Sequence, residues 1–318
     1  MRQRMFHIFP GKEAGSLLPM VWVLSLVFSG IPASGNEPAS KLLFEQITSI
    51  QGLSNNTVYD ITQDADGFIW IGTREGLNRW DGQVIKTYYH DDGSGMPGNF
   101  IEQLLSTSTG RLIVGTQKGV CIYNKKTDRF STLLYQQRSL GDVYRIIELS
   151  SKEILISTSE GLFLVNEGLE MRKLNSDVFT VLCEFRKGII WGLRGDDILV
   201  MNTEGEVIRR YSDEGESADH FDMSSSNIEC MYKDSREVVW LGTKRDGIGY
   251  YDHETDKFHC LEQEQGVNPV EDNFIRVINE DASGRLWIGT ESGLYIYCLL
   301  YTSPSPRDRT RSRMPSSA

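Results

Sequence analysis

The stretch Trp70-Ile71-Gly72-Thr73-Arg74-Glu75-Gly76-Leu77 decides the fold, because recognisable copies of it return five more times along the chain. Each copy is anchored on a glycine or, once, on a serine. The five further anchors are Gly115, Ser157, Gly192, Gly242 and Gly289. Successive anchors lie 43, 42, 35, 50 and 47 residues apart. A repeat of this length is typical of β-propeller blades or of helical repeats.

The residues between the anchors favour strands over helices. A β-branched residue stands fourteen positions before each anchor, and another apolar residue follows three positions later; the first set is Val58, Ile101, Val143, Val178, Ile228 and Ile275. Short runs rich in Val, Ile, Tyr and Trp are broken by turn-forming glycine pairs, and no window carries an apolar stripe of helical period. The sequence therefore predicts an all-β fold, a β-propeller of four-stranded antiparallel blades with six blades present of an expected seven.

The first repeat serves as the template for one blade. Asp66-Gly67 and Asp81-Gly82 suit tight hairpin turns, because glycine adopts a positive φ at little cost. Gly72 lies inside a strand, where glycine usually makes room for a neighbouring group. We expect the large Trp of an adjacent blade to fill that space. The four strands predicted, from the channel outward, are 58–63, 68–73, 77–80 and 84–89.

Both ends of the chain fall outside the predicted propeller. Residues 1–35 combine basic residues, a short apolar run and small residues before position 36, a pattern typical of a secretory signal peptide, with an uncleaved anchor as the alternative. Residues 298–318 break the blade pattern in mid-strand and resemble the translation of a sequencing adapter, so we expect a non-native, disordered tail.

The remaining segment, 36–297, is the expected propeller. Residues 42–47 resemble an outer strand that would complete the last blade and close the ring, and we expect a disc that is open or imperfectly closed. The blades are expected near 53–93, 94–136, 137–174, 175–214, 222–264 and 270–297.

The net charge of this segment limits the partners that we expect it to bind. Removing both ends takes away seven basic and two acidic residues, which leaves 26 basic and 42 acidic residues and a net charge of −16. Such a surface repels phosphate backbones, so no nucleic acid partner is expected for this part.

Free thiols are predicted at the four cysteines of this segment, with a Cys183–Cys230 bridge as the alternative in an oxidising compartment. These four are Cys121, Cys183, Cys230 and Cys260.

The sequence contains no pattern typical of a catalytic centre. The four histidines of the segment show no HxH or HxxxH spacing, and there is no GxSxG motif. Asp64-Ala65-Asp66-Gly67 begins like a calcium loop, but the remaining ligands are missing, which favours a structural turn. We therefore predict no catalytic residue, no cofactor and no metal site in this fragment.

A ligand-binding surface is the better prediction. In a propeller, the loops between blades and the loops joining the second strand to the third emerge on one face around the channel. Here these loops carry amides and charges of both signs, a mixture that suits hydroxyl-rich ligands, although such residues also cap turns. The candidate ligand-binding residues are Asn55, Asn56, Arg74, Glu75, Asn99, Lys118, Arg194, Asn227, Lys244, Arg245 and Asn273.

The repeats also resemble a known family. Leu53-Ser54-Asn55-Asn56-Thr57-Val58, followed by Asp66-Gly67, Trp70-Ile71-Gly72-Thr73 and Trp80-Asp81-Gly82, is similar to the two-component regulator propeller repeat. The resemblance implies the N-terminal periplasmic sensor portion of a hybrid histidine kinase of the Bacteroidetes type. It further implies an exported homodimer anchored in the inner membrane through a downstream helix, which senses an oligosaccharide and controls polysaccharide-utilisation genes.

Two alternatives remain open at this point. The same propeller could be joined to another output, such as a diguanylate cyclase or a DNA-binding regulator. It could also belong to a secreted propeller enzyme or an adhesion scaffold without a signalling partner.

Overall fold

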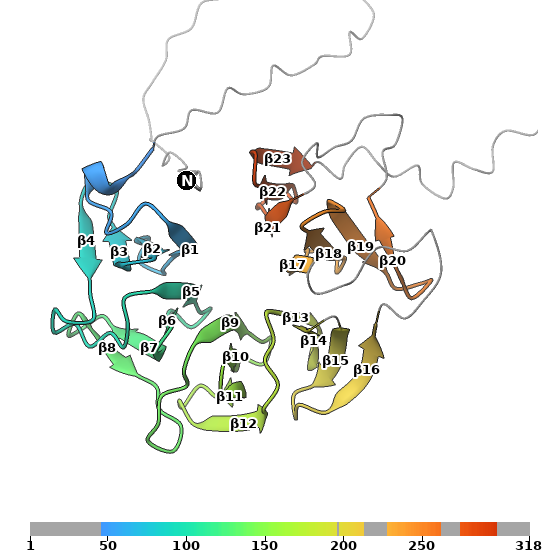
Figure 1. The fold of residues 1–318 in the computed structure, drawn as a ribbon, viewed down its shortest axis with the longest axis horizontal. Helices are drawn as coiled ribbons and strands as arrows, with labels where there is room; N and C mark the ends of the chain where they lie inside the picture. The colour runs from blue at the N-terminus through green and yellow to red at the C-terminus, as the bar shows by residue number, and fades with distance from the viewer. Residues whose placement is uncertain (1–45, 196, 213–227, 262–273, 298–318) are drawn as a thin grey trace, which may run out of the picture.

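The computed structural model describes residues 46–195, 197–212, 228–261 and 274–297. Six antiparallel sheets surround a central opening, like blades of a propeller (Figure 1). Apart from the short 3-10 helix η1 (Ser49–Gln51), every element in these ranges is a strand. None of the described helical segments is long and apolar enough to cross a membrane. The prediction of an all-β propeller is confirmed.

Within each sheet the hydrogen-bonded neighbours follow one another in sequence, so every blade is a simple meander joined by short hairpins. The first three blades consist of β1 (Val58–Gln63), β2 (Ile69–Thr73), β3 (Gly76–Trp80) and β4 (Ile85–Tyr88); β5 (Ile101–Ser106), β6 (Leu112–Thr116), β7 (Gly119–Asn124) and β8 (Arg129–Thr132); and β9 (Val143–Glu148), β10 (Ile154–Thr158), β11 (Gly161–Val165) and β12 (Met171–Asn175). The next three consist of β13 (Val181–Arg186), β14 (Ile189–Arg194), β15 (Asp197–Asn202) and β16 (Val207–Tyr211); β17 (Ile228–Lys233), β18 (Val239–Thr243), β19 (Ile248–Asp252) and β20 (Lys257–Cys260); and β21 (Ile275–Glu280), β22 (Leu286–Thr290) and β23 (Leu294–Tyr297).

The innermost strands β1, β5, β9, β13, β17 and β21 follow one another around the opening. The first and sixth blades face each other across a gap in the ring (Figure 1). Of the segment predicted to close this ring, residues 42–45 lie outside the described ranges. Ile47 packs against the cluster of Leu53, Val58 and Ile71 on the first blade.

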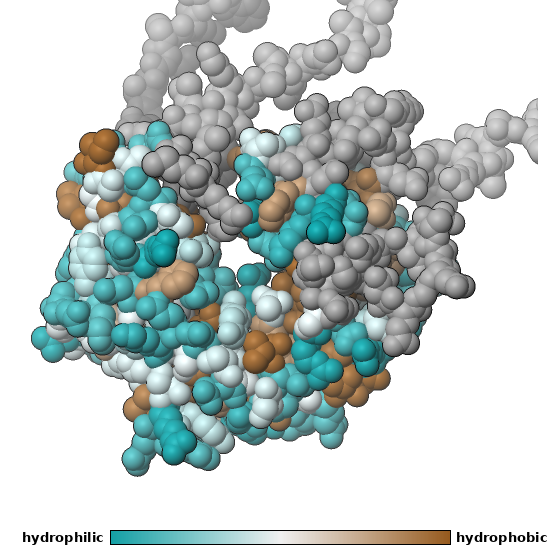
Figure 2. All heavy atoms as spheres, in the orientation of Figure 1, coloured by the Kyte–Doolittle hydropathy of each residue, from teal (hydrophilic) through white to brown (hydrophobic). Residues whose placement is uncertain are grey.

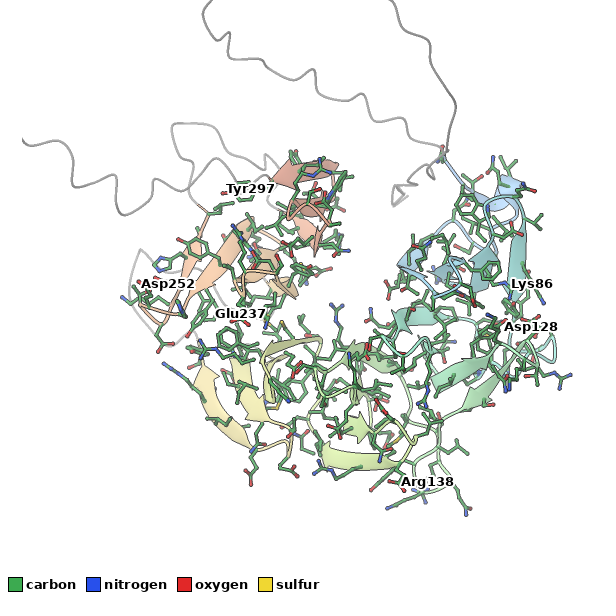
Figure 3. The ribbon with its side chains drawn as sticks, turned by 180° about the vertical axis from the view of Figure 1, so that it is seen from behind. Lys86, Asp128, Arg138, Glu237, Asp252 and Tyr297 are labelled. Atoms are coloured by element: carbon green, nitrogen blue, oxygen red, sulfur yellow. The ribbon has the colours of Figure 1, made fainter. Side chains whose placement is uncertain are left out.

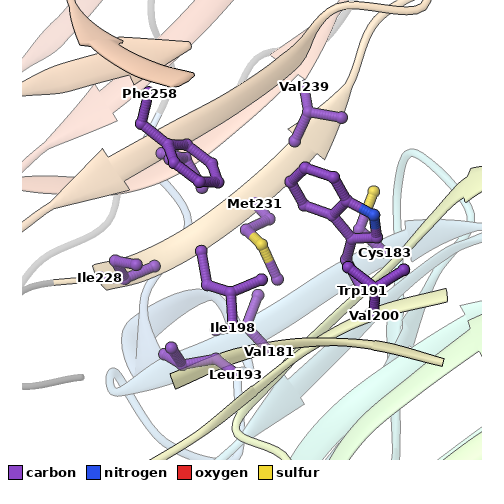
Figure 4. Packing of buried hydrophobic residues seen from close by; sticks show 11 residues of the cluster. Val181, Cys183, Trp191, Leu193, Ile198, Val200, Ile228, Met231, Val239 and Phe258 are labelled. Atoms are coloured by element: carbon purple, nitrogen blue, oxygen red, sulfur yellow. The ribbon is translucent and has the colours of Figure 1, made fainter. Parts of the chain in front are cut away.

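The hydrophobic core lies between the blades rather than at the centre. Trp191 of the fourth blade packs with Met231 and Phe258 of the fifth (Figure 4). Trp70 of the first blade makes the corresponding contact with Phe130 of the second. Both tryptophans are buried, and burying a large apolar side chain contributes roughly 1.5–3 kcal/mol. Blade-to-blade packing is therefore what holds the ring together.

The space at the anchor glycines is filled differently from our expectation. A Cβ at Gly72 would lie 2.7 Å from Cγ2 of Ile101, and one at Gly115 would lie 2.7 Å from Cγ1 of Val143. The group that needs the room is thus the β-branched residue that begins the next blade's inner strand, not a neighbouring Trp. In the third blade the anchor is Ser157, whose Oγ accepts a hydrogen bond from the backbone N–H of Phe179 at 2.8 Å.

The fourth anchor was assigned one residue too early. Gly72 pairs with Asp60 and faces the following blade, whereas in the fourth blade Leu193 pairs with Val181 and packs towards the following blade. Gly192 lies on the opposite face.

Phe179 explains this shift. A Cβ at Gly192 would lie only 2.5 Å from Cδ1 of Phe179, which takes the place that Val58 holds in the first blade. Because the bulky ring of Phe179 replaces the β-branched residue, the residue that packs against this ring, Gly192, must be glycine. The alignment on Val178 and Gly192 was therefore wrong, and Phe179 and Leu193 are the equivalent positions.

The calcium-like sequence forms a hairpin turn. The carboxylate of Asp64 accepts hydrogen bonds from the backbone N–H groups of Asp66 and Phe68, both at 3.0 Å, and from Nε1 of Trp70 at 2.6 Å. Asp234 and Asp281 hold Trp240 and Trp287 in the same way, at 3.0 and 2.8 Å. This aspartate couples the turn to the orientation of the blade's tryptophan.

Two aspartate clusters join blades at the outer rim. Asp128 accepts hydrogen bonds from the hydroxyls of Tyr88 and Tyr123 at 2.8 and 2.7 Å and pairs with Lys86 (Figure 3). Asp256 makes the same contacts between the fourth and fifth blades, with Tyr211 at 2.8 Å, Tyr251 at 2.7 Å and Arg209; both aspartates have a positive φ. Burial raises the pKa of Asp128, but the hydrogen bonds from Lys86, Tyr123 and Tyr88 outweigh it and lower the pKa to about 2.

Candidate functional site

The loops chosen from the sequence do emerge on one face. In the first, second, third and sixth blades, the loop between the second and third strands is hydrogen-bonded to the segment that leads into the inner strand of the same blade. The backbone N–H of Arg74 donates to the carbonyl of Thr57 at 3.0 Å, and that of Ser159 donates to Asp142 at 2.8 Å. Gly76 also donates to the carbonyl of Asn99 in the linker to the next blade, at 2.7 Å. The opening beside these loops remains hollow when all atoms are drawn as spheres (Figure 2).

The predicted amide residues act as turn caps. Oδ1 of Asn55 accepts from the backbone N–H of Thr57 at 2.8 Å. Oδ1 of Asn56 accepts from Ser49 at 2.7 Å, and Oδ1 of Asn99 accepts from His90 at 2.6 Å. Their carbonyl oxygens are therefore already engaged. Asn227 and Asn273 lie outside the described ranges.

The predicted charged residues are spread around the ring. The side chains that are exposed are Arg74, Glu75, Lys118, Lys244 and Arg245. Arg194 pairs with Asp177 at 3.0 Å, and Lys244 pairs with Glu229 at 3.4 Å. The structure does not gather the predicted residues into one cluster, and their binding role stays a prediction.

Comparison of the repeats within the sequence did not identify a second set of residues, which lies on the inner strands. Five inner strands share a register shift after their first residue, where one extra residue is inserted into the strand. Such a β-bulge turns a side chain away from the regular pleat. The bulge residues are Tyr59, Glu102, Tyr144, Glu229 and Arg276. Their signal in the sequence is a polar or aromatic residue directly after the β-branched one.

The bulge residues of the fifth and sixth blades neutralise each other. Nη1 of Arg276 lies 2.9 Å from Oε1 of Glu229, and its other Nη lies 3.5 Å from Glu291. The guanidinium also lies 3.7 Å from the ring centroid of Phe274, and only 14% of the arginine side chain is exposed. Lys244 adds a further positive charge beside Glu229. This sector is an internally paired network.

The charged inner-strand residues of the second and third blades are not paired in this way. Within the described ranges, the carboxylate of Glu102 and the guanidinium of Arg145 have no hydrogen bond and no ion pair, although both side chains are half-buried. Burial, and then the charge of Asp142, raise the pKa of Glu102. Tyr144, the bulge residue of the third blade, directly precedes Arg145 in β9, and its side chain is 38% exposed.

The charge of Arg145 also acts on two buried thiols of the fourth and fifth blades. Burial raises the pKa of the Cys183 thiol to about 11 and that of Cys230 to about 12, and in both the positive charge of Arg145 opposes the rise. These thiols belong to the fourth and fifth blades, whereas Arg145 belongs to the third. Its charge therefore reaches beyond its immediate neighbour.

The four cysteines that the structure describes are free, so the alternative of a Cys183–Cys230 bridge was wrong. Cys121, Cys183 and Cys230 are buried, and Cys260 is exposed. Among the residues that the structure places, no three His, Cys, Asp or Glu side chains gather as a metal site would require.

Comparison with known proteins agrees with this architecture. The two-component regulator propeller family matches residues 52–75 and 269–292. Histidine kinase P4 of Formosa agariphila is 43% identical over 63 residues, which cover 20% of this chain and 5% of that protein.

Solved structures share the fold. The extracellular domain of the proposed hybrid two-component system BT3049 from B. thetaiotaomicron has a TM-score of 0.59 at 24% identity, over 79% of this chain and 41% of that one. Virginiamycin B lyase from Staphylococcus aureus has a TM-score of 0.57 at 12% identity, over 76% and 80%. The chain thus spans less than half of the BT3049 domain and a small part of the kinase. It is a β-propeller in which two segments, residues 52–75 and 269–292, match the two-component regulator propeller family.

Proposed function

We propose that this propeller is the ligand-sensing part of a transmembrane hybrid histidine kinase that detects an oligosaccharide. The observation that carries the proposal is the 43% identity to histidine kinase P4, together with the regulator propeller repeats at both ends of the ring. The fold shared with an extracellular domain of a hybrid two-component system supports the same role.

The proposed place of action is the periplasm. Export rests on residues 1–35 as a signal peptide, and anchoring rests on a membrane helix downstream of this segment, in a homodimeric receptor. A glycan as ligand is supported by the exposed charged side chains of both signs on the loop face, such as Arg74, Glu75 and Lys118. Control of polysaccharide-utilisation genes would follow from such a ligand.

A seventh blade is part of this proposal. On the sixth blade, the face turned towards the gap carries Val277, Leu294 and Ile296, which are 51%, 37% and 40% exposed. On the other blades the corresponding face is covered, as Trp70 and Trp191 show. Exposed apolar faces of this kind are normally covered by another element. Strands that follow residue 297, with residues 42–47 as the outermost strand, would cover it.

Two experiments test the proposal. A fusion of alkaline phosphatase after residue 297 should be active in cells, and deletion of residues 1–35 should abolish that activity. The full-length natural protein in liposomes should transfer phosphate from ATP to itself, and oligosaccharides should change that rate. A full reading frame that lacks a kinase domain would refute the kinase assignment.

A further inference from the structure

Two aromatic rings meet where the innermost strands of the first and second blades begin, on the face from which the loops emerge. Tyr59 is the bulge residue of β1, and Phe100 directly precedes β5. Their ring centroids lie 4.6 Å apart with the planes at 62°, an edge-to-face contact that joins the two blades. Both residues are half-buried, so this seam presents part of an aromatic surface to solvent.

An unsatisfied acceptor belongs to the residue bonded to Phe100. The backbone N–H of Gln117, in the loop between β6 and β7, donates to the carbonyl of Phe100 at 3.3 Å, which brings the two residues together. Within the described part of the chain, Oε1 of Gln117 is buried and accepts no hydrogen bond. A buried oxygen without a donor destabilises the fold, and such a group calls for an explanation.

A buried amide of the first blade shows what a structural role looks like. Oδ1 of Asn78 accepts from the backbone N–H of Ser54 at 2.9 Å, and its Nδ2 donates to Oγ of Ser54 at 2.8 Å and to the carbonyl of Ile71 at 3.2 Å. Asn78 thereby ties the segment before β1 to its blade. Oε1 of Gln117 makes no such tie, so a ligand that donates a hydrogen bond would complete it.

We propose that Tyr59, Phe100 and Gln117 form a subsite for one pyranose unit of a glycan, at the seam between the first and second blades. The proposal rests on the glycan-sensing function above and deepens it. The two rings contact the C–H groups on one face of the sugar. The half-buried side chain of Gln117 turns towards the sugar, and its Oε1 accepts a hydrogen bond from a hydroxyl.

A pyranose combines the two properties that this site requires. Its ring C–H groups form an apolar face for the aromatic pair, and its hydroxyls are hydrogen-bond donors for the amide oxygen. A purely apolar ligand would leave Oε1 of Gln117 unpaired, and a bare anion carries no donor for it. The combination of rings and acceptor therefore favours a sugar over either alternative.

Thermal stability tests the unpaired oxygen without any ligand. Gln117→Leu removes an acceptor that has no donor, so the melting temperature of the propeller should stay the same or rise. Asn78→Leu is the matched control, because it breaks the bonds to Ser54 and Ile71 and should lower the melting temperature by about 4 °C or more. A loss for Gln117→Leu as large as that for Asn78→Leu would overturn the proposal, since Oε1 would then already have a partner such as an ordered water.

Binding tests the subsite itself. The full-length natural protein would be titrated calorimetrically with cellohexaose, xylohexaose, laminarihexaose and mannohexaose. For a sugar that binds, Phe100→Leu should weaken binding about five- to tenfold, because it keeps apolar bulk but loses the aromatic face, and Phe100→Tyr should restore it. Gln117→Leu should weaken binding by a similar factor at an unchanged melting temperature.

The third blade supplies a matched control for the aromatic pair. The ring of Tyr135, which follows the outermost strand β8, meets that of Phe163 in the same edge-to-face manner, with centroids 5.3 Å apart. Tyr135→Leu removes a comparable contact away from the innermost strands. It should leave sugar binding unchanged.

The outcomes separate the subsite from the proposed function. A sugar whose binding is insensitive to Phe100→Leu and Gln117→Leu would refute the subsite and leave glycan sensing standing. Failure of every sugar to bind would count against glycan sensing itself, and the subsite would fall with it. An equal loss for Tyr135→Leu, or a loss that Phe100→Tyr does not restore, would also refute the subsite, because the effect would then come from general packing.

Discussion

The contact between Phe179 and Gly192 predicts a strong energetic coupling. Phe179 is fully buried, and a Cβ at Gly192 would lie 2.5 and 2.9 Å from its ring atoms and 3.1 Å from Cδ2 of Leu182. The first blade solves the same packing problem with Val58 against Ile71. Exchanging both residues for the first-blade pair should therefore be tolerated, whereas either exchange alone should not.

The magnitudes follow from packing. Phe179→Val leaves a cavity and should reduce the free energy of unfolding by about 2–3 kcal/mol, below the roughly 3–5 kcal/mol of a Phe→Ala change. Gly192→Ile overpacks the same site and should cost about 3 kcal/mol, at the upper end of such changes. The double variant should lie within about 1.5 kcal/mol of the parent, because shape and volume are restored. The resulting coupling energy is about 3 kcal/mol or more.

Urea unfolding followed by tryptophan fluorescence would measure all four proteins, since Trp191 lies in the affected blade. Gly293→Ala is the control, because a Cβ there meets no atom within 4 Å. Combined with Phe179→Val, it should give additive effects. Additivity of Phe179→Val and Gly192→Ile within about 0.5 kcal/mol would refute the assigned register of the fourth blade.

Three further predictions concern the turns, the rim and the thiols. Asp64→Ala should lower the free energy of unfolding in urea by about 2–3 kcal/mol, because two backbone N–H groups and Trp70 lose their acceptor, while Asp64→Asn should cost less. Asp128 has a lowered pKa in the folded state, so its contribution is present above about pH 4 and is lost as the pH falls towards 2; Asp128→Asn should cost about 1 kcal/mol at pH 7, since the carboxylate is 36% exposed, and little at pH 2. Among the described cysteines, iodoacetamide should label Cys260 in the native protein, as peptide mass spectrometry would show, and should reach the buried thiols only after unfolding; these are Cys121, Cys183 and Cys230.

For each of these three predictions, one experimental result would contradict it. A loss no larger for Asp64→Ala than for Asp64→Asn would mean that the turn does not depend on the carboxylate position. A difference between parent and Asp128→Asn that grows on acidification would contradict the lowered pKa. Labelling of Cys183 in the native state would contradict its burial.

The site was only partly predictable. Both sets of loops emerge on the expected face, because hairpin connectivity forces alternate turns to opposite ends of a blade. The roles of individual residues did not follow, since Asn55, Asn56 and Asn99 direct their oxygens to nearby backbone N–H groups. An asparagine before a strand looks the same in sequence whether it caps a turn or binds a ligand.

By itself, the sequence determined the repeat, the strands and turns within each blade, and the propeller they form, because β-branched residues and glycine turns act over a few neighbouring positions. Only the tertiary structure decided the register of the fourth blade. There the large Phe179 takes the place that Val58 holds in the first blade, and the small Gly192 takes the place of Ile71. The tertiary structure also decided which inner-strand charges pair, as Glu229 and Arg276 do, and which stay open, as Glu102 and Arg145 do. Phe179 and Gly192 lie 13 positions apart and Glu229 and Arg276 lie 47 apart, and which of these residues meet depends on how the chain packs at the blade interfaces.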